Sequence, residues 1–283
     1  MALSITHTLD LEDSRPSERH PARYRVGLER ILEIHQRHGT RMTVFVVGSL
    51  ARSDPALVTE LADAGHEIGL HSDQHIPIRD LGAEAFEADT QRGMETLAEI
   101  LGKKPAGYRA PIFSLTPDVP FAPQLLTDLG FEYSSSVLPA KNPLYGFPGA
   151  PSRPFRWSSG LLELPAPVFS TPLGKLPVLG GIYFRYMPHS LIKKSVERDL
   201  RHASKPIAAW SYLHPYDADP MDPFIRIRGA SLPVSLLLRA KRAGTAQKLN
   251  KLLSDELWRH APPFIERVST GEFSSAPVFP PIG

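Results

Sequence analysis

Apolar runs and helical patterns alternate along the first half of the chain. The short apolar runs predict strands at residues 3–9, 42–47, 67–70 and 107–110. Segments whose apolar residues recur at helical spacing predict helices at residues 23–38, 54–64, 83–101 and 116–130. Proline is favoured at the first helical position, which supports helix starts at Asp54-Pro55 and Thr116-Pro117. Strands that alternate with helices indicate βαβ units, and therefore an α/β fold with a parallel sheet.

This alternation weakens after residue 137. Residues 139–188 are rich in proline and glycine and contain only short strand candidates, such as residues 161–164. Farther along, the pattern predicts helices at residues 188–202 and 245–258 and a strand at residues 207–213. A long irregular stretch inside a compact domain is more often functional than accidental.

Composition narrows the class of protein. The 283 residues are 42% hydrophobic and 22% charged, which suits a sizeable core and argues against wholesale disorder. The net charge of +2 does not indicate a nucleic-acid partner, and the lack of cysteine excludes disulfides and thiolate metal sites. The N-terminus lacks the pattern of a secretory signal, and no apolar run approaches the roughly 18 residues that span a bilayer. We therefore expect a soluble, cytoplasmic protein.

Three carboxylates, Asp10, Glu12 and Asp13, follow the first predicted strand. They repel one another, and a chain that turns out of a sheet can aim two of them into one cavity. A cation bound there would neutralise them. A solvated acidic turn explains the cluster equally well, so the cluster alone does not establish a site.

Two histidines, His71 and His75, follow the third predicted strand. Histidines four residues apart lie on one face of a helical turn and can chelate one metal ion. Chance pairs are common among 11 histidines, so this pair alone is weak support for a metal site. With one carboxylate from the first cluster, it completes the set of two imidazoles and one carboxylate that zinc binds while positions stay open for water and substrate.

Arg109 and His214 also stand at predicted strand ends. Side chains at the carboxyl ends of parallel strands point into the region where α/β active sites form. An arginine there can hold a carboxylate in position. The simpler interpretations are a surface ion pair for Arg109 and a hydrogen-bonded core residue for His214. Four such groups at successive strand ends favour one shared site.

The motifs around these residues resemble those of the polysaccharide deacetylases of the NodB-homology group, carbohydrate esterase family four. The similar segments are Thr8-Leu-Asp-Leu-Glu-Asp13, His71-Ser-Asp-Gln-His75, Tyr108-Arg-Ala-Pro-Ile-Phe-Ser114 and Tyr212-Leu-His-Pro215. Residues 131–139 and 145–151 also resemble the bacterial subgroup that is associated with exopolysaccharide export. The resemblance covers about residues 3–220.

The resemblance implies a distorted (β/α) barrel with seven strands in a single domain. We expect the barrel at residues 1–220, a C-terminal helical extension packed on it at residues 221–274, and a loose tail at residues 275–283. The family also implies one divalent metal ion, with zinc the first choice and nickel, cobalt, manganese or iron as alternatives.

By position in the motifs, the resemblance assigns a role to each candidate residue. Asp10 would be the general base, oriented by Arg109, and His214 the general acid. His71 and His75 would be metal ligands, and either Glu12 or Asp13 would be the third. Contacts with the substrate would come from Tyr108, Pro111 and Phe113.

The implied function is hydrolysis of N-acetyl groups from an amino sugar, or from a polysaccharide or glycolipid intermediate, in bacterial surface-polysaccharide metabolism. Three alternatives stay open: an amidohydrolase of small cyclic amides or ureides, an inactive sugar-binding relative, and an esterase for acetyl esters. The expected partner is an N-acetylated sugar or glycan, and no nucleic acid. The sequence does not indicate an oligomeric state.

Two further features carry expectations of their own. Related sequences often have aspartate at the position of Ser134, and an acid tunes the late histidine in the family. We therefore expect His214 to lose its proton at lower pH here, unless Asp217 or Asp219 substitutes.

Leucines lie beside basic residues within residues 232–251, which suits weak contact with an anionic membrane surface such as the inner membrane. A core helix with a solvated basic side is the simpler interpretation.

Overall fold

The computed structural model describes residues 3–15, 17, 19–142, 146–171, 174–201, 208–224 and 232–279. Their main sheet has nine strands, and eight of them follow the order β10-β1-β2-β3-β4-β5-β7-β6. The ninth, β11, pairs with the start of β1. The strands are β1 (Leu3–Leu11), β2 (Met42–Val46), β3 (Glu67–Leu70), β4 (Gly107–Tyr108), β5 (Tyr133–Ser134), β6 (Phe155–Arg156), β7 (Leu162–Glu163), β10 (Ala208–Leu213) and β11 (Trp258–His260).

The strands from β10 to β7 in this order are all parallel, and β6 joins β7 antiparallel. The predicted α/β class and the barrel-like architecture are confirmed. The predicted strand number, seven, counts only the parallel strands from β10 to β7. β6 and β11 raise the total to nine, because β6 pairs with the last parallel strand, β7, and β11 pairs with the start of β1.

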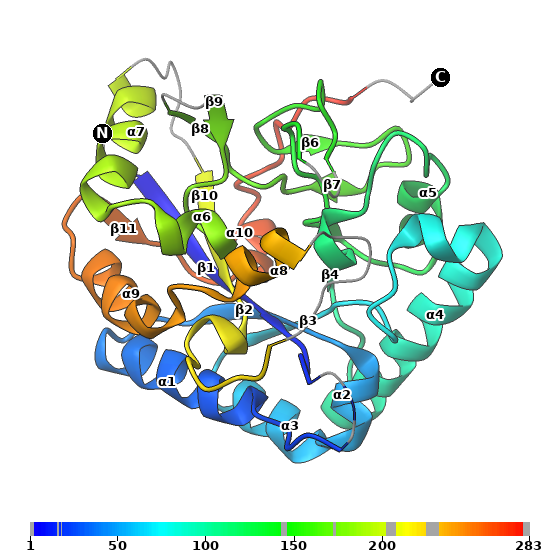
Figure 1. The fold of residues 1–283 in the computed structure, drawn as a ribbon. Helices are drawn as coiled ribbons and strands as arrows, with labels where there is room; N and C mark the ends of the chain where they lie inside the picture. The colour runs from blue at the N-terminus through cyan, green and yellow to red at the C-terminus, as the bar shows by residue number, and fades with distance from the viewer. Residues whose placement is uncertain are drawn as a thin grey trace.

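Helices cover the outer face of the curled sheet (Figure 1). In this view α1, α2 and α3 lie along the lower side, and α4 and α5 lie on the right. The helices are α1 (Tyr24–Arg37), α2 (Gly48–Ser53), α3 (Pro55–Asp63), α4 (Ile78–Leu101), α5 (Ala122–Asp128), α6 (Gly181–Tyr186), α7 (His189–Arg201), α8 (Leu232–Arg239), α9 (Thr245–Leu253) and α10 (Phe264–Ser269). A small second sheet pairs β8 (Phe169–Thr171) with β9 (Gly174–Leu176).

The spacing of apolar residues in each helix and strand determines which side chains lie in the core. Leu28, Ile31 and Ile34 recur at helical spacing on α1, and all three are buried. β2 is buried along its whole length, as expected for a parallel strand that is covered on both faces. The apolar pattern of the sequence therefore places the sheet at the centre of the molecule.

Several element boundaries differ from the prediction. α4 begins at Ile78 rather than at residue 83, and it is interrupted at Gly82, whose φ of 71° is outside the helical region. The helix predicted at residues 245–258 ends at Leu253. The side chain of Asp255 accepts the backbone N–H of Leu257 at 3.0 Å, which turns the chain out of the helix and into β11. The segment after residue 220 thus contributes a strand to the sheet as well as helices.

The tail is not loose between residues 275 and 279. Val278 forms a parallel bridge with Arg156, and the ring of Phe279 lies 5.3 Å from that of Phe155 and 5.9 Å from that of Trp157, centroid to centroid. Burial of this aromatic group offsets the entropy of ordering the segment. The predicted tail was therefore wrong for these residues, and residues 280–283 lie outside the described part of the chain. Among the described residues, no helix combines the length and apolarity needed to cross a bilayer.

Candidate active site

The carboxyl ends of four parallel strands bring the predicted residues together. Asp10 lies near the end of β1, His71 directly follows β3, Arg109 follows β4 and His214 follows β10. These strands occupy neighbouring places in one sheet, so their ends share one edge. This is the edge at which α/β folds bind ligands.

Glu12, His71 and His75 form one group of potential metal ligands. One ligand atom from each residue lies within 4.8 Å of the other two, and within the described part of the chain this is the one such group. His75 Nε2 lies 2.7 Å from Glu12 Oε2. The Nδ1–H of His71 donates to the carbonyl oxygen of Arg109 at 2.8 Å, which leaves Nε2 unprotonated to accept a metal ion. Two imidazoles and one carboxylate in this arrangement fit a divalent metal of the zinc type.

The electrostatics of the group also suit a cation. Burial lowers the pKa of His71 to about 4, so its imidazole is neutral near pH 7 and can act as a ligand. Burial alone would raise the pKa of Glu12, but the charge and hydrogen bond of His75 outweigh it and hold the pKa well below the usual range. Metal ligands must be deprotonated, and both groups meet that condition.

The structure distinguishes between Glu12 and Asp13, the two candidates for the third metal ligand. Asp13 lies outside the group formed by Glu12 and the two histidines, and its Oδ2 is paired with Arg15 Nε at 2.6 Å. Its Oδ1 accepts the backbone N–H of the same arginine at 3.1 Å. Glu12 is therefore the carboxylate whose position fits a metal ligand.

Asp10 lies beside this group and is held by Arg109. The Nη1–H of Arg109 donates to Asp10 Oδ1 at 2.7 Å, and the same nitrogen also donates to Thr8 Oγ1 at 2.8 Å. The guanidinium is fully buried and stacks at 4.1 Å on the ring of Phe45 and at 4.3 Å on that of Trp210, measured to the centroids. A planar cation held in this way fixes the direction in which Asp10 points.

His214 lies beside the same group, directly after β10. Its Nδ1–H donates to Asp217 Oδ2 at 3.0 Å, and Asp217 Oδ1 is paired with Arg185 Nη1 at 3.0 Å. His214 Nε2 lies 3.9 Å from both Asp10 Oδ2 and Glu12 Oε1. Burial alone would lower the pKa of His214, but the hydrogen bond and charge of Asp217, with the charges of Glu12 and Asp10, raise it to about 9. The imidazolium form is therefore favoured at neutral pH.

The expected effect of Ser134 is not supported by this geometry. Ser134 is fully buried, and its hydroxyl donates to Ser136 Oγ at 2.8 Å. Asp217 takes the role of the missing aspartate, whereas Asp219 is paired with Arg23 at 2.6 Å. The signal for Asp217 was its position three residues after His214. No local pattern indicated Arg185, which comes from α6.

The three predicted substrate contacts have different surroundings. The ring of Tyr108 is fully buried in the core, 6.0 Å from that of Phe86, so its side chain is not exposed to a substrate. Pro111 is also buried. Phe113 packs edge-on against Tyr212 at 5.2 Å, beside the candidate site. Sequence reasoning missed its neighbour Ile112, which is 42% exposed and has a φ of 48°.

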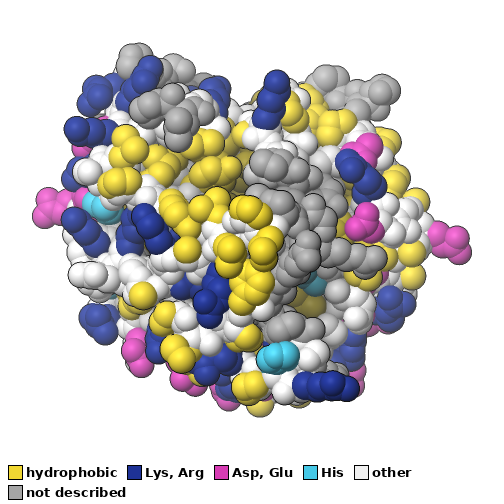
Figure 2. Space-filling view, viewed as in Figure 1, with side chains coloured by type: hydrophobic (Ala, Val, Ile, Leu, Met, Phe, Trp, Pro, Cys, Tyr) yellow, Lys and Arg dark blue, Asp and Glu magenta, His cyan; other side chains and the backbone are white. Residues whose placement is uncertain are grey.

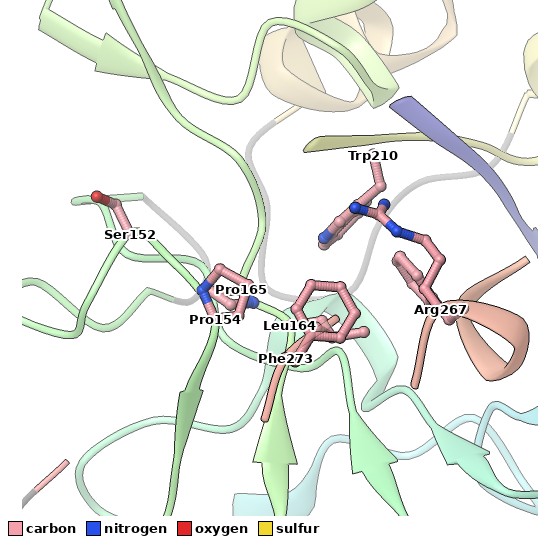
Figure 3. Close-up of a pocket in the computed structure, with 8 residues that line it drawn as sticks. Ser152, Pro154, Leu164, Pro165, Trp210, Arg267 and Phe273 are labelled. Carbon is pink, nitrogen blue, oxygen red and sulfur yellow. The ribbon is translucent and has the colours of Figure 1, made fainter. Parts of the chain in front are cut away.

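A pocket lined by Trp210 and Arg267 does not contain the candidate residues (Figure 3). Arg267 Nη1 donates to the side chain of Thr6 at 2.9 Å. Thr6 precedes Asp10 by four strand residues, or roughly 13 Å along β1. The pocket thus extends toward the start of β1, while Trp210 in its wall also stacks on Arg109.

The α8 face, which we define as Leu232, Leu236 and Leu237, is exposed to between 47% and 52%. Figure 2 shows hydrophobic side chains gathered over this helix, with lysine and arginine side chains nearby. Two of the neighbouring cations are already engaged. Arg242 is buried and paired with Asp222 at 2.8 Å, and Lys248 donates to the backbone carbonyls of α6. The basic character that suggested membrane contact is therefore weaker than the sequence indicates.

Comparisons with known proteins agree with the predicted resemblance. Residues 21–134 match the family model described as polysaccharide deacetylase. Residues 135–265 match a second model, described as a domain of unknown function, DUF3473. The first match contains His71, His75 and Arg109, and the second contains His214. Asp10 and Glu12 precede both matches.

Two of the matching curated relatives are named for peptidoglycan deacetylation. The chain is 34% identical over 131 residues to the peptidoglycan deacetylase-like protein FGM2 of Gibberella zeae, a match that covers 44% of this chain and 38% of that protein. It is 27% identical over 113 residues to the peptidoglycan deacetylase of Helicobacter pylori, covering 40% of this chain and 38% of the relative. The chain thus spans well under half of the length of these relatives.

The fold itself is shared with solved structures. A Mycobacterium smegmatis protein described as a polysaccharide deacetylase superposes with a TM-score of 0.64 over 97% of this chain and 92% of that one. The identity is 20%, so this likeness concerns the fold alone.

Proposed function

We propose that the protein is a metal-dependent hydrolase that removes N-acetyl groups from an amino-sugar glycan, because residues 21–134 match the family model of polysaccharide deacetylases. The observation that carries this proposal is the convergence of Glu12, His71 and His75 within 4.8 Å beside two groups suited to proton transfer. The names of the curated relatives support a peptidoglycan-like or other surface polysaccharide as the substrate.

The proposed metal ligands are Glu12, His71 and His75, and zinc suits this set best. A divalent ion bound there would polarise the acetyl carbonyl and lower the pKa of a bound water toward ~7. An amide is a poor electrophile and its amine a poor leaving group, so the other side chains must move two protons.

Asp10 is the proposed general base. Arg109 occupies Asp10 Oδ1, while Oδ2 faces the cavity near His214. The free oxygen can accept a proton from the attacking water. Orientation by Arg109 keeps this oxygen in one position, so that no reorganisation is needed during the reaction.

His214 is the proposed general acid. Its Nδ1–H is bound to Asp217, so Nε2 carries the proton that faces the cavity when the ring is charged. It can donate this proton to the departing sugar amine. The base and the acid start in opposite protonation states, which is the pairing that amide hydrolysis requires.

The test is acetate release by the metal-loaded protein from N-acetylated glycan oligomers, such as peptidoglycan fragments and chitooligosaccharides. Wild-type protein should release acetate, and Asp10→Asn should not. Cleavage of a cyclic ureide in place of acetate release would favour the amidohydrolase alternative. Release from acetyl esters alone would favour the esterase. Glycan binding by the metal-loaded protein without turnover would identify an inactive sugar-binding relative.

A further inference from the structure

The loop that carries both histidines has an unusual backbone. Ser72 has a φ of 60° and His75 a φ of 56°, and neither is glycine. A side chain in this left-handed region is costly and persists only when the surroundings over-determine it. Something outside the loop must therefore hold residues 71–75 in this shape.

Asp89, on α4, is the main external contact of the loop backbone. It is 1% exposed, and its Oδ2 accepts the backbone N–H of Asp73 at 2.8 Å. Its Oδ1 accepts the backbone N–H of Gln74 at 3.2 Å. One buried carboxylate thus binds two consecutive amides between the histidines, and a carboxylate accepts such bonds more strongly than a neutral group does.

The opposite side of the loop is held by α2. Arg52 binds the buried side chain of Asp73 through two N–H groups, at 2.6 and 2.9 Å. The backbone N–H of Gly48 donates to the carbonyl of Ser72 at 3.0 Å. A side chain at Gly48 would not fit, because its Cβ would lie 2.3 Å from Asp73 Oδ1.

Neither buried carboxylate belongs to the proposed metal group or to the acid–base pair. Asp73 and Asp89 also lie close enough for each charge to disfavour the other. Two like charges in the protein interior are unfavourable unless hydrogen bonds or opposite charges compensate for them. Asp89 binds the backbone between His71 and His75, while Asp73 lies in that segment and binds the side chain of Arg52.

We propose that Asp89 and the Asp73–Arg52 pair are positioning residues that set His71 and His75 for metal binding before the metal arrives. This inference rests on the proposed metal site. Groups that orient metal ligands from behind typically contribute a factor of about 10 to 100 in metal affinity. Loss of Asp89 should therefore weaken metal binding without removing a ligand.

The test compares Asp89→Asn with Glu87→Gln, which removes an exposed charge from the same helix. Zinc dissociation constants are measured by competition with a chelator. Amide exchange of residues 71–75 is measured in the metal-free protein. We expect Asp89→Asn to weaken zinc binding by about 10- to 100-fold and to speed exchange of the Gln74 amide, while Glu87→Gln changes neither.

A second variant, Arg52→Gln, acts on the loop through a side chain that is 42% exposed, so the fold is less at risk. It should weaken zinc binding in the same direction. Wild-type affinity in a folded Asp89→Asn protein, or unchanged exchange at Gln74, would overturn the inference. Absence of zinc binding by wild-type protein, with His71→Ala as the reference, would contradict the proposed function instead. The exchange result would then still decide whether Asp89 fixes the loop.

Discussion

Histidines gather at both ends of β1, and the two clusters differ in their partners. At the carboxyl end, His71, His75 and His214 lie among Asp10, Glu12 and Asp217. Toward the amino end, His7 at the middle of β1 lies close to His35 and His260, and the rings of His7 and His35 are 5.1 Å apart; we call this group the amino-end cluster. The hydrogen bonds of this second cluster go to hydroxyl groups, a backbone carbonyl and a second imidazole.

The amino-end cluster has a fixed direction of hydrogen bonding. The carbonyl of Leu253 can only accept, so His260 Nε2 donates to it at 2.9 Å. His260 Nδ1 then accepts from His7 Nε2 at 3.1 Å, and His7 Nδ1 accepts from the hydroxyl of Ser211 at 2.9 Å. In this arrangement His7 donates from Nε2 and accepts on Nδ1, which is the pattern of a neutral ring. Burial with the other histidines accordingly lowers the pKa of His7 well below its usual range.

The contrast teaches that burial alone does not make a histidine cluster reactive. Acidic partners favour the charged ring and can share a cation with it, whereas neutral partners favour the uncharged ring and a structural role. Substitutions in the carboxyl-end cluster should therefore change the catalytic activity. Substitutions in the amino-end cluster should change the pH dependence of stability.

The largest expected effect follows from removing the base at the carboxyl end. Asp10→Asn should keep the metal, because Asp10 is not in the ligand group, and should lower kcat by roughly 10²- to 10⁴-fold. Asp13→Asn serves as the control, since this residue is paired with Arg15. The measurement is acetate release together with metal content. Near-normal acetate release by Asp10→Asn would show that another group is the base.

The next effect concerns the acid. The pKa of His214 is raised to about 9 mainly by Asp217, against the effect of burial. Asp217→Asn should lower this pKa. The alkaline limb of kcat/KM should therefore move from about pH 9 toward ~6.5. Profiles that superimpose on those of wild-type protein would rule out His214 as the acid tuned by Asp217.

Ser134→Asp provides the matched contrast. The Ser134 hydroxyl points to Ser136, and its neighbour Glu163 is also buried. An added carboxylate there should lower the stability of the protein and leave the alkaline limb in place. An upward shift of that limb in a folded, metal-loaded variant would mean that residue 134 acts on His214 after all.

A smaller effect is expected at the amino end. Burial lowers the pKa of His35 to about 3, so the unfolded chain binds a proton near pH 6.5 that the folded protein takes up only at lower pH. Stability is thus complete above about pH 6.5 and is lost as the pH falls toward 3. His35 alone contributes a slope of up to about 1.4 kcal/mol per pH unit.

His35→Gln should make the acid side of the stability curve shallower by that amount. Urea unfolding between pH 4.5 and 7 measures it. The neighbouring histidines remain in the variant, so the comparison is with the wild-type slope. Equal slopes would mean that His35 is not held neutral by the fold.

The smallest expected effect concerns the α8 face. Leu236→Ser together with Leu237→Ser should reduce flotation with anionic liposomes at low salt if these exposed side chains contact the bilayer. Lys251→Gln is the matched control for a nearby exposed cation. Absence of wild-type co-migration with the liposomes would remove membrane contact from the account.

The sequence predicted the first half of the fold better than the second for a physical reason. From β1 to β4 each element has its own apolar period, so strand ends such as Asp10, His71 and Arg109 could be located from the chain alone. From residue 133 onward the short strands β5, β6 and β7 are defined by pairing with neighbours. Pairing partners are not encoded in local pattern.

The candidate site shows the same limit. Residues that follow strands were predicted, and the structure brings Asp10, Glu12, His71, His75, Arg109 and His214 together. The choice of Glu12 over Asp13 required the pairing with Arg15, and Arg185 reaches Asp217 from a helix about thirty residues earlier. Such contacts depend on tertiary packing, which a single sequence does not display.

The most direct test of the central claim is the metal content of three purified proteins, measured by elemental analysis after loading with zinc and exhaustive dialysis. We expect one zinc ion per chain in wild-type protein and in Asp13→Asn, and little or none in Glu12→Gln. This pattern would support Glu12, with His71 and His75, as the ligand set. Full occupancy in Glu12→Gln, or loss of zinc in Asp13→Asn, would contradict the proposed metal centre.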